Sequence, residues 1–268
     1  MNNASNGNMP EGYGELISRM GRFVGEKVSE NFLLLDELDA QLTKGNTNRA
    51  TLSKLYANNM RMLRFIRMLT AFGLYKYGQE RFCPENTDVS HTVRQLCKQT
   101  QDILRDTHIT VKFSAGKTRV MTVADPAKLS EALLCLISNA VRCCTDTVEM
   151  GAAQDAGEVV IWIFDNGEPA DSVTCRFIHE ALENGLDNCD GSGTGLVIAR
   201  MIAQLHGGKL EFVPRTDGNE FRITLPLRYM DEVKLQSGHM EYSTRFTPAR
   251  IALCDYFDGR RIVEKSED

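Results

Sequence analysis

Apolar residues recur every three or four positions through residues 15–43, the spacing that places side chains on one face of an α-helix. A short polar stretch interrupts this pattern, and its Gly45 suits the position just past a helix end. The pattern resumes over residues 50–77, which predicts a second long helix and therefore an antiparallel hairpin. The apolar positions of the first helix are Leu16, Met20, Phe23, Val24, Val28, Phe32, Leu35, Leu38 and Leu42.

A lone helical hairpin cannot cover both of its apolar faces. We therefore expect residues 15–80 to pair with a second copy of the chain as a four-helix bundle, which makes the protein a homodimer. The alternative is that the hairpin packs against the rest of its own chain.

Beyond a break at residues 82–86, helical and strand patterns alternate. This order favours an α+β fold, a sandwich with helices on one face of a mixed sheet. The expected helices are 89–104, 128–144 and 196–207, the expected strands are 109–113, 158–164, 209–213 and 220–227, and residues 168–190 are polar and irregular. The expected organisation is a disordered tail (1–14), the dimerisation hairpin (15–80), the sandwich domain (86–228) and an extension of unknown role (229–268) with a strand-like run at 250–256.

Composition narrows the class of protein. The chain has 268 residues, of which 42% are hydrophobic and 25% charged, as in soluble globular proteins. Its formal net charge of −5 argues against a nucleic-acid partner. The apolar run 32–35 is too short for a transmembrane segment, as is every other apolar run, and no signal peptide is visible. The eight cysteines form no CxxC pair, so we expect reduced thiols and a cytoplasmic protein.

Three glycines at alternate positions, Gly191 to Gly195, run directly into the helix expected at 196–207. Glycine allows the backbone to approach a ligand closely, and a helix N-terminus offers unpaired N–H groups and a favourable dipole end to anions. The segment is therefore a candidate phosphate site. Glycines at such a turn also serve packing, which is the alternative.

Two further groups could complete such a site. Asn139 and Arg142 share a helix face, where an amide oxygen can ligate Mg²⁺ and a guanidinium can grip phosphate. A solvated helix face is the alternative. Asp165 ends the apolar strand 158–164, where a carboxylate needs a donor such as the amino group of adenine. Gly167 would let the base approach, although Asp-Asn-Gly is also an ordinary turn.

Asn139, Asp165 and the glycine segment have the order and spacing of the N, G1 and G2 boxes of the GHKL ATPases, and the chain most resembles the histidine-kinase branch of that superfamily. The stretches 205–208 and 221–226 match the same pattern, and the hairpin resembles the dimerisation and phosphotransfer helices of those kinases, especially at 60–66. The resemblance covers residues 15–227. It implies that ATP and Mg²⁺ are bound, that residues 86–228 form a histidine kinase-like ATP-binding domain, and that residues 168–190 form a lid over the nucleotide.

By this resemblance Asn139 ligates Mg²⁺, Arg142 contacts phosphate and Asp165 binds adenine. No catalytic residue is assigned. The full set of expected nucleotide-binding residues is Asn139, Arg142, Asp165, Gly167, Gly191, Gly193, Thr194, Gly195 and Leu196.

Several positions depart from the kinase pattern. No histidine precedes His91, so the first hairpin lacks a phosphoacceptor imidazole, and Glu30 stands nearest the expected place. Cys135 replaces the amide or carboxylate one turn before Asn139, and a thiol is a poor Mg²⁺ ligand and a poor base. Cys143 replaces an aromatic residue that stacks on adenine, and Pro169 replaces a glycine of the G1 box. His206 is expected to cap a helix rather than to catalyse.

These departures favour a histidine-kinase-like signalling protein that binds ATP and Mg²⁺, lacks histidine autophosphorylation, and acts through an unidentified protein partner. Two alternatives stay open. One is an active kinase of a partner residue, and the other is a nucleotide-free dimeric scaffold.

Overall fold

The computed structural model describes residues 24, 26–31, 33–38, 49–76, 81–115, 119–184, 194–230 and 247–256. The chain divides into two compact units, residues 1–62 with 258–268, and residues 63–257. The tail expected at 1–14 lies outside the described residues, and so do Gly45, Gly191 and Gly193.

The first unit contains two antiparallel helical segments. Residues 26–31 and 33–38 are helical, and α2 (Arg49–Lys76) begins in this unit. Asn31 donates to the side chain of Asn59 at 3.0 Å, and Thr51 donates to Glu37 at 3.3 Å. From the first contact to the second, the residue number rises in one helix and falls in the other. The two helices are therefore antiparallel, as in the predicted hairpin. Leu33 is 69% exposed and Leu35 is 48% exposed, so apolar side chains lie on the surface of this unit.

The second unit is built on a five-stranded sheet in the order β2-β4-β5-β7-β6. Strands β2 and β4 are parallel and the other neighbours are antiparallel. The strands are β2 (Thr110–Ala115), β4 (Thr147–Asp155), β5 (Glu158–Asp165), β6 (Lys209–Arg215) and β7 (Gly218–Pro226).

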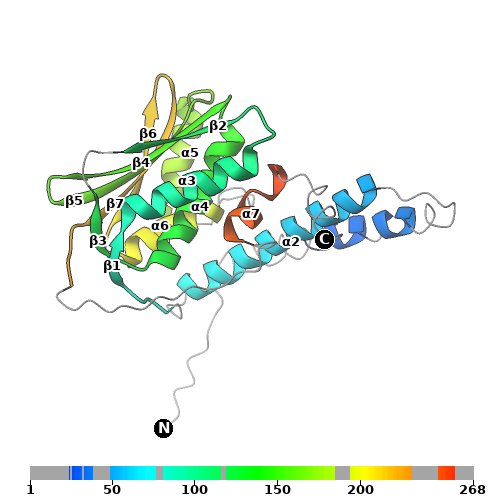
Figure 1. Ribbon diagram of the computed structural model, residues 1–268, viewed down its shortest axis with the longest axis horizontal. Coiled ribbons are helices and arrows are strands. Elements are labelled where there is room, and N and C mark those ends of the chain that lie inside the picture. The colour runs from blue at the N-terminus through cyan, green and yellow to red at the C-terminus, as the bar shows by residue number, and fades with distance from the viewer. Residues whose placement is uncertain are drawn as a thin grey trace, which may run out of the picture. The chain divides into compact units, whose positions relative to one another are not determined.

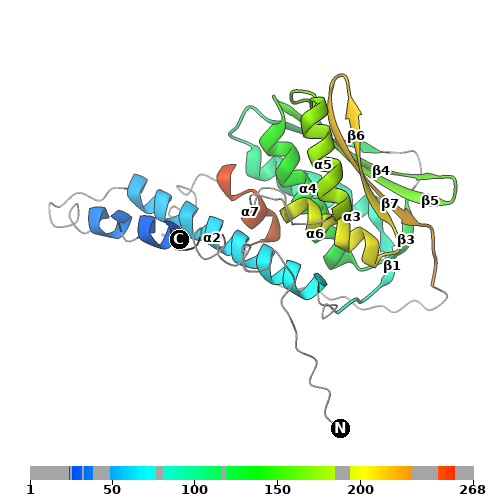
Figure 2. The same ribbon diagram turned by 180° about the vertical axis from the view of Figure 1, so that it is seen from behind.

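Helices cover one face of this sheet, so the predicted α+β sandwich is confirmed (Figures 1 and 2). The covering helices are α3 (Val89–Leu104), α4 (Pro126–Cys143) and α6 (Thr194–Leu205). Alternate residues of β5 face this layer: Val159, Ile161 and Ile163 are buried, whereas the residues between them are partly exposed. Asp125 begins α4 by accepting hydrogen bonds from the N–H groups of Ala127 and Lys128, each at 3.1 Å.

Six elements differ from the sequence predictions. The break at 82–86 runs into β1 (Glu85–Asp88), which pairs with β3 (Met121–Ala124), and β4 was not expected. The supposedly irregular segment 168–190 contains α5 (Ser172–Asn184), which begins where Asp171 accepts a hydrogen bond from the N–H of Thr174 at 2.7 Å. The strand-like run at 250–256 is instead helical, as α7 (Pro248–Ala252) and the 3₁₀ turn η2 (Cys254–Tyr256). Thr247 and Pro248 favour a helix start there, because the Thr247 hydroxyl caps the N–H of Arg250.

Candidate functional site

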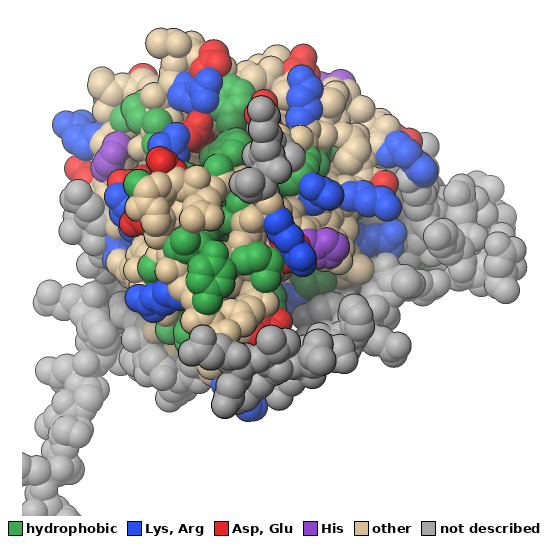
Figure 3. Space-filling model, turned by 60° about the vertical axis from the view of Figure 1, so that its left-hand side comes forward, with side chains coloured by type: hydrophobic (Ala, Val, Ile, Leu, Met, Phe, Trp, Pro, Cys, Tyr) green, Lys and Arg blue, Asp and Glu red, His purple; other side chains and the backbone are tan. Residues whose placement is uncertain are grey.

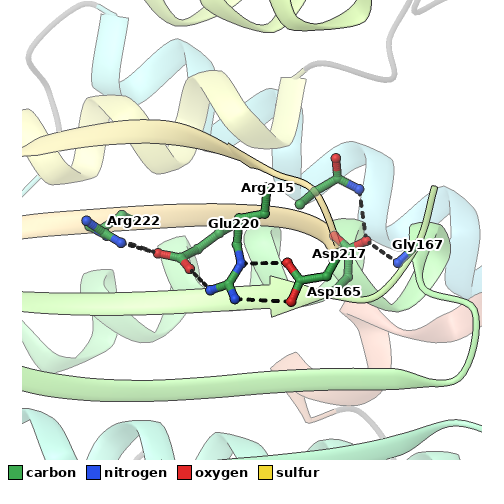
Figure 4. A network of polar contacts seen from close by, with 7 residues as sticks. Asp165, Gly167, Arg215, Asp217, Glu220 and Arg222 are labelled. Carbon is green, nitrogen blue, oxygen red and sulfur yellow. Dashed lines mark hydrogen bonds and ion pairs between the residues drawn. The ribbon is translucent and has the colours of Figure 1, made fainter. Parts of the chain in front are cut away.

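Asp165 is a buried carboxylate at the end of β5, with only 1% of its surface exposed. Its Oδ1 accepts hydrogen bonds from the Gly167 N–H and the Asn219 amide, both at 3.1 Å (Figure 4). Burial raises the pKa of Asp165 despite these two bonds. Both hydrogen bonds that the described residues donate to this carboxylate go to Oδ1. Oδ2 can therefore accept a hydrogen bond from a ligand.

Asn219 organises the loop that follows Asp165. Besides the Asp165 bond, its side-chain amide donates to the carbonyl of Glu168 at 3.0 Å, and its Oδ1 accepts from the N–H of Ala170 at 2.9 Å. It thereby holds both residues that flank Pro169. Sequence reasoning missed Asn219, which lies between the strands expected at 209–213 and 220–227. The signal lies in the strand register, because β5 and β7 pair Asp165 with Asn219.

Gly167 lies against the end of α4. A Cβ at this position would stand 2.1 Å from the carbonyl oxygen of Cys143, so no larger residue fits without a backbone shift. The glycine is therefore required by packing within the protein itself. The contact brings the Asp165 loop beside the last turn of α4. Burial, followed by the nearby Asp165 carboxylate, raises the pKa of the Cys143 thiol.

Asn139 and Arg142 are partners in this structure. Arg142 donates to Oδ1 of Asn139 at 2.8 Å. This is the oxygen that would ligate Mg²⁺, and Arg142 lies close enough to it to turn toward a bound phosphate. Arg142 is exposed, and contacts of this kind at a protein surface contribute little to stability. Breaking the Arg142–Asn139 hydrogen bond would therefore change the free energy of the protein little.

The N-terminus of α6 lies over α4 at Cys135. A Cβ on Gly195 would stand 3.6 Å from the Cβ of Cys135, which is ordinary van der Waals contact. Thr194, Gly195 and Leu196 form the first turn of α6, whereas Gly191 and Gly193 lie outside the described residues.

Helix α4 thus connects the candidate pieces. Cys135, Asn139 and Cys143 follow one another at intervals of about one turn. Gly195 packs at the first of them and Gly167 at the last. The two contacts are about 12 Å apart along the helix, from the rise of about 1.5 Å per residue. Asn139 lies between them.

Cys135 is a neutral thiol. Burial, with the Glu131 carboxylate as the next contribution, raises its pKa to about 12. Glu131 in turn accepts a hydrogen bond from the Tyr75 hydroxyl at 3.0 Å. A thiol in this state cannot act as a base at neutral pH, nor does it attract a hard cation.

A charged network supports the hairpin that carries Asn219 (Figure 4). The buried carboxylate of Glu220 is paired with both Arg215 and Arg222. Arg215 also holds Asp217 through two hydrogen bonds, at 2.9 and 3.2 Å. These pairs fix the turn between β6 and β7, next to the strand position that faces Asp165.

His206 bridges two helix ends. Its Nδ1 hydrogen-bonds to the carbonyl of Ile202 at 2.7 Å, and its Nε2 accepts the N–H of Asp125 at 3.0 Å. The carbonyl can only accept, so Nδ1 carries the proton. Because backbone groups occupy both ring nitrogens, this histidine has a structural role.

Glu30, nearest the expected phosphoacceptor place, and the backbone of His91, the first histidine of the chain, make local contacts, whereas the His91 side chain is exposed. Glu30 is exposed and pairs with Lys27 at 2.8 Å, a contact that lowers the pKa of Glu30. The N–H of His91 donates to Asp88, the N-cap of α3, at 2.9 Å.

The described residues contain no cluster of three or more His, Cys, Asp or Glu side chains suited to a metal ion. Within the same part of the chain, no helix has the length and apolar character needed to cross a bilayer. On the face drawn in Figure 3, basic and acidic side chains lie side by side, so this face carries no charge of a single sign.

Comparison with known proteins identifies part of the second unit. Residues 124–229 match the family model of the histidine kinase-, DNA gyrase B-, and HSP90-like ATPases. Residues 124–229 are a GHKL ATPase domain. The GHKL domain contains α4, the Asp165 loop, α6 and the β6–β7 hairpin.

Curated relatives include sensory kinases. The adaptive-response sensory kinase SasA of Prochlorococcus marinus (strain MIT 9313) is 26% identical over 156 residues, which cover 56% of this chain and 42% of that protein. The sensor protein KdpD of Clostridium acetobutylicum is 22% identical over 206 residues, 74% of this chain and 22% of KdpD. The methanogenesis regulatory histidine kinase FilI of Methanothrix harundinacea is 28% identical over 131 residues, 47% of this chain and 15% of FilI. The chain thus spans less than half the length of each of these relatives.

Solved structures share the fold. The histidine kinase AdeS of Acinetobacter baumannii superposes with a TM-score of 0.58 at 16% identity, covering 75% of this chain and 96% of that one. Full-length ShkA, solved in complex with AMPPNP, gives a TM-score of 0.57 at 18% identity, covering 78% and 46% of the two chains. The fold expected from the GHKL resemblance is therefore confirmed.

Proposed function

We propose that this chain is a dimeric signalling protein that binds ATP and Mg²⁺ in the GHKL domain and does not phosphorylate a histidine of its own hairpin. The observation that carries the proposal is the arrangement along α4, where Asn139 lies between the contacts with Gly167 and Gly195. The GHKL domain implies nucleotide binding, and the ShkA structure contains a nucleotide analogue.

The residues present fit a nucleotide with Mg²⁺. The Asn139 amide offers a hard oxygen of the kind Mg²⁺ prefers, and Arg142 can turn from Asn139 to phosphate. Oδ2 of Asp165 accepts no hydrogen bond from the part of the chain that the structure describes, and it suits an amino-group donor on the adenine base. The first turn of α6 can provide N–H groups to phosphate. We assign the nine expected residues to this site, with Asn139 as the metal ligand.

Two features of the sequence motivate the second half of the proposal. Residues 1–90 contain no histidine, and Cys135 is a neutral thiol one turn before Asn139. Signalling would then depend on conformation and on contact with a partner protein. Residues 15–80 would be the dimerisation unit, consistent with the exposed Leu33 and Leu35 of its first helix. The cytoplasm, where ATP and reduced thiols coexist, is the proposed compartment.

Thermal unfolding with MgADP or MgATP tests nucleotide binding directly. A ligand at 100 times its Kd stabilises the native state by about 2.7 kcal/mol, so Tm should rise with nucleotide concentration. Asp165→Asn should reduce the rise, whereas Asp155→Asn, at the exposed end of β4, should keep it. No rise for the wild-type chain at millimolar nucleotide would favour the nucleotide-free scaffold.

A further inference from the structure

The C-terminal residues 247–256 fold into the second unit as an additional packed segment. Thr247 caps α7, and η2 follows directly. Four of its side chains are almost fully buried, with between 1% and 3% of their surface exposed: Ala249, Ile251, Leu253 and Cys254. Such burial means that the segment is held by apolar packing as well as by polar contacts.

On one side the segment is bonded to α4 at the candidate nucleotide site. The Ser138 hydroxyl donates to the carbonyl of Ala252 at 2.9 Å. The Tyr256 hydroxyl donates to the carbonyl of Val141 at 3.1 Å. Ser138 immediately precedes Asn139, and Val141 immediately precedes Arg142. The segment is therefore hydrogen-bonded to the turn of α4 that carries both proposed ligand contacts.

On another side the segment is bonded to α2 within the second unit. Arg64 donates to the carbonyl of Ala252 at 3.1 Å and forms an ion pair with Asp255 at 3.0 Å. The Ala252 carbonyl thus accepts from α4 and from α2 together. Figures 1 and 2 both show α7 beside α4.

We propose that residues 247–256 are an intramolecular strap that couples nucleotide occupancy at Asn139 and Arg142 to residues 63–76 of α2. The strap fixes the last turn of α4 in a defined position, and a fixed site binds its ligand more tightly than a mobile one. The proposed ligand contacts at Asn139 and Arg142 lie next to the strap contacts at Ser138 and Val141, so ligand and strap act on the same few residues. Linkage then requires that each stabilises the other to the same extent.

This proposal rests on nucleotide binding by the GHKL domain and adds a regulatory element to it. A protein that displaced the strap would loosen the nucleotide site. Conversely, nucleotide binding would hold α2 to the strap through Arg64 and Asp255.

The test uses the full chain and two substitutions. Tyr256→Phe removes only the hydroxyl that reaches Val141, and Tyr229→Phe is the matched control at an exposed tyrosine. Isothermal titration with MgADP should give a Kd about fivefold or more higher for Tyr256→Phe and an unchanged Kd for the control. Hydrogen exchange should show that MgADP slows the exchange of residues 247–256 in the wild type.

Asp255→Asn provides the second arm. Loss of its ion pair with Arg64 should speed hydrogen exchange in residues 63–76 without nucleotide, and should reduce the protection that MgADP gives to this segment. Two results together would overturn the coupling while leaving nucleotide binding intact. They are an equal Kd for Tyr256→Phe and the wild type, and a hydrogen-exchange rate of residues 247–256 that MgADP does not change. If the wild type does not bind MgADP, the proposed function fails as well, and the two failures are thereby distinguished.

Discussion

Asn219 donates a hydrogen bond to Oδ1 of Asp165 over 3.1 Å, although the two residues are 54 positions apart in the sequence. The antiparallel pairing of β5 and β7 places them opposite one another. A side chain of the neighbouring strand therefore orients the carboxylate that we propose to bind adenine. The same Asn219 side chain also bonds to Glu168 and Ala170 in the loop that follows Asp165.

Asn219→Ala should destabilise the protein and weaken nucleotide binding. It removes a donor to a buried carboxylate, a bond to a charged group that is worth about 1.5–3 kcal/mol. The free energy of unfolding in urea at pH 7.5 should fall by roughly that amount. Gln154→Ala, at an exposed amide of β4, serves as the control. An unchanged urea midpoint would show that Asn219 does not orient the carboxylate.

Asp165→Asn should stabilise the ligand-free protein at neutral pH. Burial raises the pKa of Asp165, so its ionised form is less favourable in the folded than in the unfolded chain. Wild-type stability is lost as the pH rises through the folded pKa, and the amide avoids this loss. The Tm of Asp165→Asn should exceed that of the wild type at pH 7.5, and the difference should vanish below about pH 4, near the unfolded pKa.

The same substitution should impair binding. If the new amide keeps its oxygen toward Asn219 and Gly167, its NH₂ group faces the ligand in place of Oδ2. A donor then meets the amino group of adenine, and we expect affinity to fall at least about tenfold. A variant that is stabilised yet binds normally would remove Asp165 from the site.

Thiol alkylation should separate the cysteines by environment. Cys83 is exposed and should react first with iodoacetamide at pH 8, and Cys143, which is exposed but has a raised pKa, should react more slowly; mass spectrometry reports both. Cys97 and Cys254 are buried, and the pKa of Cys135 is raised to about 12, so these three should react only on unfolding. MgATP should slow the reaction of Cys143, which borders the Asp165 loop. Rapid labelling of Cys135 in the folded protein would contradict this description.

Leu33→Glu should convert a dimer into a monomer. Leu33 is a largely exposed apolar side chain of the first helix, and a charge there would be costly to bury in an interface. Light scattering after gel filtration should report the mass of two chains for the wild type and of one chain for the variant. Val173→Glu, an equally drastic change at an exposed position of α5, should remain dimeric. A monomeric wild type would refute the proposed bundle.

The sequence predicted the elements whose apolar pattern is strong. The helix expected at 89–104 has those bounds in α3, and α6 and the strands β6 and β7 correspond to the helix expected at 196–207 and the strands expected at 209–213 and 220–227. Strand β4 was missed because its centre, Gly151 to Ala153, has little strand preference and depends on pairing with β2 and β5. The apolar residues at 251 and 253 stand at alternate positions, which suggested a strand. Both residues are buried, but they belong to the helical segment 248–256.

The candidate site was predictable where motifs are local. Asn139, Asp165 and Gly195 belong to motifs whose spacing is visible in the sequence. Asn219 reaches the site through strand register, and Tyr256 through the packing of a distant segment, so neither could be predicted from a local pattern. The role of Gly167 also changed. The sequence suggested room for a base, and the structure adds that the Cys143 carbonyl leaves no space for a side chain.

Isothermal titration of the full chain with MgATP, in parallel with Asn139→Ala, tests the central claim most directly. The wild type should bind saturably, and the variant should lose most of its Mg²⁺-dependent affinity because the amide oxygen proposed as the metal ligand is gone. Equal binding by both chains, or no binding by the wild type at millimolar MgATP, would contradict the account.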